Sequence, residues 1–214
     1  MDHTDSFIDE VTEEVRRDRL FAMFRKYGWV GVVAILGLVG GSAFFEWQKA
    51  QARARAEGFG DAILSALEAE NPGEAVAAVP VEGAQAGLAK LLIAAQAAED
   101  GKAEAALVDL RTIAEDATLP ESLRQLARLK AVLVAGAAMT PEARKAELEA
   151  LTQPGAPFRL LAMEQQAVAA VAAGDKDAAI AKAREILAED GVTSGLQQRA
   201  SELIVALGGD PAAK

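Results

Sequence analysis

The chain offers few side chains that could perform acid–base or nucleophilic chemistry. It has no cysteine and a single histidine, at position 3. General acids and bases are usually histidines or pKa-shifted carboxylates, and thiol chemistry and Cys-ligated metal sites need cysteine. The remaining candidates are carboxylates whose spacing is typical of solvated helix faces and ends: Glu99, Asp100, Asp109, Glu115 and Asp116. We therefore expect no enzymatic activity, no cofactor and no metal site.

The charge distribution argues against nucleic acid as a partner. The formal net charge is −10, and residues 46–214 contribute 25 acidic and 17 basic side chains, a net −8. A phosphate backbone requires a basic surface. The glycine-rich stretch "GLVGG" lacks the Gly-Lys-Ser/Thr element of a phosphate-binding loop and lies in an apolar run.

The apolar run itself indicates a membrane span. Residues 27–45 hold 19 consecutive uncharged positions. On a helix they cover roughly 28 Å, close to the ~30 Å hydrocarbon core of a bilayer. A cleaved signal peptide is the alternative, and Ala50-Gln51-Ala52 could serve as its cleavage site. The apolar region of a signal peptide is shorter than this run, however, and 26 residues precede the run. We therefore expect an uncleaved transmembrane helix over residues 27–47.

Orientation and helix contacts follow from the residues in and around this run. Five basic residues precede it and three follow within about 20 positions, which predicts a cytoplasmic N-terminus. Trp29 and Trp47 are spaced as anchors for the two interfaces. Gly37 and Gly41 form a small-xxx-small pair that permits close helix packing, against a partner or a second copy, although glycines are also common in spans generally.

The rest of the chain reads as alanine-rich helices separated by prolines. Alanine is the best helix former, and aromatic residues are only 5% of the chain. We expect a cytosolic amphipathic leader over residues 1–26, a helical extension and linker over 48–83, helical repeats over 84–207 and a disordered tail over 208–214. The expected helical segments are 84–101, 102–116, 121–139, 141–151, 158–174, 175–187 and 196–207.

Two of these segments resemble each other. "GKAEAALVDLRTI" from Gly101 and "GDKDAAIAKAREI" from Gly174 align without a gap, 73 residues apart. A diverged middle copy turns at Thr140-Pro141, so the period is about 36, close to the ~34 of tetratricopeptide repeats. The two glycines are expected to end their preceding helices with positive φ. The alternative is an irregular helical bundle with chance similarity. The predicted fold is all-α, with one N-terminal transmembrane helix and a tetratricopeptide-like α-solenoid domain.

The order of these features resembles a known family. The leader "FIDEVTEEVRRDRLFAMFRKYGW", one span, Trp47, and the repeats "AAEDGKAEAAL" and "AAGDKDAAIAKAREIL" are similar to bacterial membrane-anchored ancillary subunits of the SecYEG translocon. The resemblance covers nearly the whole chain. It implies a single-span inner-membrane protein with a periplasmic repeat domain. It also implies association with the translocon and a periplasmic prolyl-isomerase-like chaperone, and assistance to exported chains.

The leading functional hypothesis is thus a protein-binding adaptor at the translocon. The alternative is an envelope-stress regulator whose cytosolic leader binds a signalling protein. An envelope enzyme ranks last.

Overall fold

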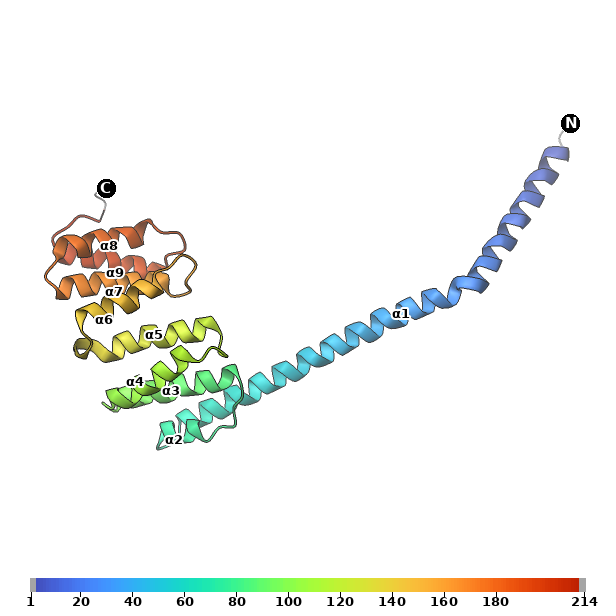
Figure 1. Cartoon of the computed structure of the whole chain (residues 1–214). Coiled ribbons are helices and arrows are strands. Elements are labelled where there is room, and N and C mark those ends of the chain that lie inside the picture. The colour runs from blue at the N-terminus through green and yellow to red at the C-terminus, as the bar shows by residue number, and fades with distance from the viewer. Residues whose placement is uncertain (1–2, 212–214) are drawn as a thin grey trace. The chain divides into compact units, whose positions relative to one another are not determined.

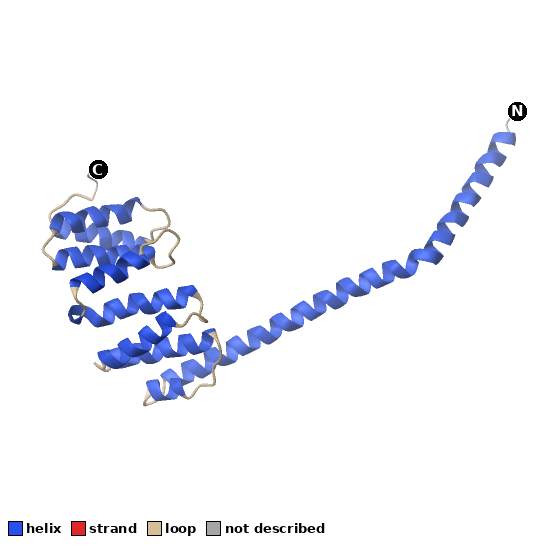
Figure 2. Ribbon diagram, in the orientation of Figure 1, coloured by secondary structure: helices blue, strands red, loops and turns tan. Residues whose placement is uncertain are grey.

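The structure, a computed structural model, describes the backbone of residues 3–211, and their side chains except for 3–24, 27, 28 and 32. All regular elements in this part are helices, which confirms the predicted all-α class (Figure 2). The chain divides into two compact units, Met1–Gly58 and Phe59–Lys214.

Helix α1 (His3–Leu67) includes the predicted span. Among the described residues it is the one helix long and apolar enough to cross a membrane, over Trp29–Leu67, and its most apolar window has no residue buried in the protein. The helix continues through Gly58 and Gly60, two positions at which glycine weakens a helix by up to ~1 kcal/mol relative to alanine. The helical extension after Trp47 is therefore present as far as Leu67.

The second unit is a succession of helices, each packed against the next along the chain from α2 to α9 (Figure 1). Their bounds are α2 (Pro72–Ala77), α3 (Ala84–Glu99), α4 (Ala103–Glu115), α5 (Glu121–Ala135), the 3-10 turn η1 (Gly136–Ala138), α6 (Pro141–Leu151), α7 (Arg159–Ala172), α8 (Lys176–Ala188) and α9 (Ser194–Ala206).

The hydrophobic core of this unit consists of four overlapping clusters. Each joins three consecutive helices and shares a helix with the next cluster: the end of α1 with α2 and α3, then α3–α4–α5, α5–α6–α7 and α7–α8–α9. Alanines take part in these contacts, and Ala106, Ala127, Ala162 and Ala183 are fully buried. Small side chains let helix axes approach closely, so an alanine-rich chain with few aromatics can still form a dense core.

Some helix ends differ from the expected ones for local reasons. The segment expected to extend to residue 139 ends at Ala135, because Gly136 adopts a φ of 47° and the chain tightens into η1. Helix α9 begins earlier than expected, at Ser194, because the Thr193 hydroxyl accepts a hydrogen bond from the Leu196 N–H and caps the helix. Helix α2 forms within the expected linker, with Pro72 at its first position.

Candidate functional site

The apolar part of α1 is exposed in the described part of the chain. Its large side chains are exposed around the whole circumference of the helix: Trp29, Val30, Val33, Ile35, Leu36, Leu38, Val39, Phe44, Phe45 and Trp47. Soluble proteins rarely expose apolar surface this contiguous, whereas a lipid bilayer solvates it, and a helix satisfies its own backbone there. The segment therefore has the properties of a candidate membrane-spanning helix.

The residues singled out on this helix keep their predicted places. Trp29 and Trp47 are both exposed near the two ends of the apolar run, and the Trp47 ring lies 6.2 Å from that of Phe44, centroid to centroid. A Cβ built on Gly37 or Gly41 would meet nothing within 4 Å. The Ser42 hydroxyl donates to the Val39 carbonyl at 2.9 Å, so its proton is bonded within the helix. Anchoring by the tryptophans and helix packing at the glycines stay predictions.

The two glycines predicted at turns do end helices. Gly101 has a φ of 76° and Gly174 a φ of 78°, which confirms the expected conformation. In both turns the residue after the glycine donates its N–H to the carbonyl five residues earlier, at 2.8 Å after Gly101 and 2.9 Å after Gly174. This pairing satisfies the last carbonyls of α3 and α7 and reverses the chain into α4 and α8.

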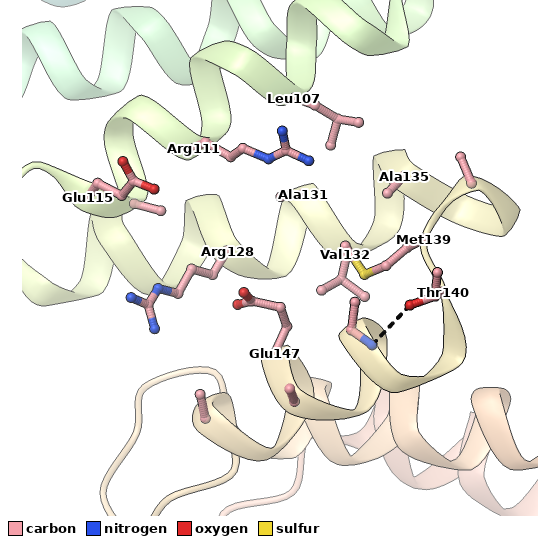
Figure 3. Close-up of a pocket in the computed structure, with 15 residues that line it drawn as sticks. Leu107, Arg111, Glu115, Arg128, Ala131, Val132, Ala135, Met139, Thr140 and Glu147 are labelled. Carbon is pink, nitrogen blue, oxygen red and sulfur yellow. Dashed lines mark hydrogen bonds between the residues drawn. The ribbon is translucent and has the colours of Figure 1, made fainter.

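A groove of about 510 Å³ in the second unit is formed by α4, α5 and α6. Helix α4 supplies one wall, α5 the floor, and α6 with the preceding turn the other wall (Figure 3). The end near Leu107, Ala135 and Met139 is apolar, while Glu115 and Arg128 lie at the opposite end (Figure 3). Alanines complete the lining: Ala114, Ala131, Ala138, Ala143, Ala146 and Ala150.

Four charged side chains face this groove: Arg111, Glu115, Arg128 and Glu147. None of them has a hydrogen bond or ion pair with the described part of the chain. They comprise two guanidinium groups and two carboxylates, so the lining is neutral within an acidic domain. The groove thus combines an apolar end with unpaired hydrogen-bond donors and acceptors, as ligand sites commonly do.

Several charged groups elsewhere in the second unit make internal contacts. Arg159 donates to Glu189 at 2.6 Å, which lowers the pKa of that carboxyl, and Arg199 makes a two-pronged contact with Glu164 at 2.5 and 2.9 Å. A hydrogen bond from the Thr118 hydroxyl lowers the pKa of Asp116. These contacts tie α7 to the loop after α8, α7 to α9, and the α4–α5 loop to itself.

Asp100 is held in the same way, by hydrogen bonds from the Gln96 amide and then the Lys102 ammonium, and its pKa is lowered. Two of the five carboxylates considered in the sequence therefore have structural partners. Among the described residues, no group of three or more His, Cys, Asp or Glu side chains could hold a metal ion.

Sequence reasoning missed the groove because its members come from three segments with no shared motif. One signal was available: Arg111 aligns with Arg184 in the ungapped alignment of the two similar segments 73 residues apart. Comparison with known proteins adds no further assignment, because no family model, curated protein or solved structure matches the chain.

Proposed function

We propose that the chain is a non-enzymatic, membrane-anchored adaptor whose second unit is a tetratricopeptide-like helical-repeat domain that binds protein partners. The observation that carries the proposal is the series of four overlapping three-helix cores. In repeat proteins each unit contacts only its neighbours. Each of the four cores likewise joins only helices that are consecutive in the chain.

The spacing of the helices supports the repeat. Helices α3, α5, α7 and α9 begin at Ala84, Glu121, Arg159 and Ser194, which are 37, 38 and 35 residues apart. Both bounds of α8 lie 73 residues after those of α4, and α9 begins 73 residues after α5. These intervals are close to the ~34-residue period of tetratricopeptide repeats, each a pair of helices.

The end of the series also supports it. Val132 of α5 is 0% exposed beneath α6, whereas Val205, its counterpart 73 residues later on α9, is 60% exposed. The same outer face of α9 carries Gln198 and Glu202, hydrogen-bonded to each other at 2.8 Å. Gln198 and Glu202 thus supply polar groups beside the exposed Val205, and polar groups on the outer face are typical of the terminal units of repeat proteins.

The proposed location is the bacterial inner membrane, with the N-terminus in the cytoplasm and the repeat domain in the periplasm. The apolar helix and the excess of basic residues before it support this orientation. The proposed partners are the SecYEG translocon and a periplasmic chaperone, as the family resemblance implies. A second copy of the chain, packed through Gly37 and Gly41, is a further candidate partner.

Photocrosslinking in intact membranes tests this function. A crosslinking residue at Ala146 in the groove, or at Val39 in the apolar helix, should yield adducts with translocon or chaperone subunits, identified by mass spectrometry. A reporter active only in the periplasm, fused after Lys214, should be active. Adducts restricted to cytosolic signalling proteins captured by residues 1–26 would instead support the regulator.

A further inference from the structure

The C-terminal segment shows how one of the aligned arginines binds non-helical backbone. Arg184 of α8 donates from Nη2 to the main-chain carbonyl of Asp210 at 3.0 Å. The segment lies close against the helices: a Cβ at Gly209 would come within 2.9 Å of Ile204 Cγ2 and 3.2 Å of Ile180 Cδ1. A guanidinium and two apolar side chains therefore hold non-helical chain by its main chain.

The counterparts of these three residues line the groove. Arg111, Leu107 and Ala131 lie 73 residues before Arg184, Ile180 and Ile204, and all three are lining residues. In the groove, however, the guanidinium of Arg111 has no carbonyl of the described chain to bind.

The turn that replaces the C-terminal segment at this point explains the difference. It is tightened into η1, and the Gly136 carbonyl, one residue before Ala137 (the counterpart of Asp210), accepts from the Arg144 guanidinium and the Met139 N–H. Arg111 faces the groove, and its guanidinium has no acceptor in the described part of the chain.

We propose that the groove of α4, α5 and α6 binds an extended, non-helical segment of a partner polypeptide through its main chain. Arg111 donates to a backbone carbonyl of the segment, and Glu147 on the opposite wall accepts a backbone N–H (Figure 3). An apolar side chain of the segment occupies the end formed by Leu107 and Met139. Because the contacts are to the main chain, the groove tolerates many sequences, which suits unfolded clients.

Charge complementarity favours this occupant over a helix or a charged peptide. The lining offers equal numbers of unpaired guanidinium and carboxylate groups, so it selects no net charge. An extended chain presents main-chain donors and acceptors that need partners on both sides, whereas the groups inside a helix are already paired. The inference rests on the proposed adaptor function and names the client of its repeat domain.

Fluorescence anisotropy with the full chain in nanodiscs tests the inference. The probe is a short labelled peptide in which Val and Leu alternate with Ser and Thr, and it is compared with two others. The first has the same sequence with alternate amide nitrogens methylated, which removes N–H donors. The second is locked as a helix with one apolar stripe.

The variants separate groove contacts from general charge. Arg111→Gln removes a charged donor, and we expect about tenfold weaker binding of the extended peptide, the effect of one charge-assisted hydrogen bond. Lys176→Gln removes an equal charge from the exposed start of α8 and should bind as wild type does. Glu147→Ala should weaken binding of the unmethylated peptide but not of the methylated one.

Three results would overturn the inference: no binding of the extended peptide by wild type, equal affinities for Arg111→Gln and Lys176→Gln, or tighter binding of the helix-locked peptide. Crosslinks to translocon or chaperone subunits in intact membranes test the adaptor function separately. If those crosslinks persist while peptide binding fails, only the groove assignment is wrong.

Discussion

Helices α1 and α4 use apolar residues in opposite ways. Leu38 in the apolar run of α1 is 75% exposed, whereas Leu110 of α4 is 1% exposed. In α4 the buried residues Ala106, Leu110 and Ile113 form one stripe, and the charged residues Glu104, Arg111 and Glu115 are exposed. An amphipathic stripe needs a protein neighbour on one side, while an unbroken apolar surface needs an apolar solvent on all sides.

Glycine shows the same dependence on context. Gly37 and Gly41 lie within a continuous helix and leave its surface open, while Gly101 and Gly174 have positive φ and end helices. The absence of a Cβ thus provides room in one unit and a left-handed turn in the other. Substitutions made in matched pairs across the two units can test each half of this contrast.

The largest effect is expected from shortening the same residue type in both units. Leu110→Ala should reduce the free energy of unfolding of the helical domain by about 2–5 kcal/mol, because it leaves a cavity in the α3–α4–α5 core. Leu38→Ala should leave this value unchanged. Urea unfolding in detergent, followed by circular dichroism, measures both; equal losses would mean that the Leu38 side chain supports the domain.

An introduced charge should be disfavoured in the apolar run of α1 and tolerated on the exposed face of α4. Leu38→Arg should disfavour membrane insertion by about 3 kcal/mol, the penalty for a charge near the centre of a span. Val108→Arg, at a position 61% exposed on α4, should change neither insertion nor unfolding by more than about 0.5 kcal/mol. Carbonate extraction of membranes and urea unfolding report the two quantities. Full membrane retention of Leu38→Arg would count against the span.

The turn glycines should respond more weakly. Gly174→Val should destabilise the helical domain by about 1–2 kcal/mol, because a β-branched residue is strained at the φ of 78°. Gly58→Val is the control, since this glycine lies within α1, lacks a positive φ and has nothing within 4 Å of an added Cβ. It should cause no loss. Unchanged urea midpoints for Gly174→Val and Gly101→Val would refute the assignment of these turns as repeat boundaries.

The smallest effect concerns acid. The pKa of Asp116 is lowered in the folded protein, so its stabilisation is fully present above the ordinary carboxyl pKa of about 4 and declines as pH falls below it. Asp116→Asn should flatten the loss of stability below about pH 4. Asp177→Asn, at a carboxylate without a hydrogen bond in the described chain, should retain the wild-type slope. Thermal unfolding measured across this pH range distinguishes the two variants.

Local sequence patterns were enough to predict the all-α class of the fold and many of its helix ends and turns. The charge-free run, the 3.6-residue stripes and the glycines before α4 and α8 each depend on interactions between residues close in sequence. Interactions between residues close in sequence govern the period of the apolar stripe, the positions of helix ends and the conformation of turns. The exceptions were also local: the turn at Gly136 and the cap at Thr193 shifted two helix ends.

The groove, in contrast, was decided by tertiary packing alone. Leu107, Arg128 and Met139 come from α4, α5 and the turn before α6, and nothing in their sequence spacing requires them to meet. Whether an arginine faces a groove or binds a carbonyl depends on the path of a distant segment, as Arg111 and Arg184 demonstrate. The sequence by itself determined which helices form and where they end. Only the packing of one helix pair on the next determined which side chains remain without partners, because that depends on contacts between residues far apart in the chain.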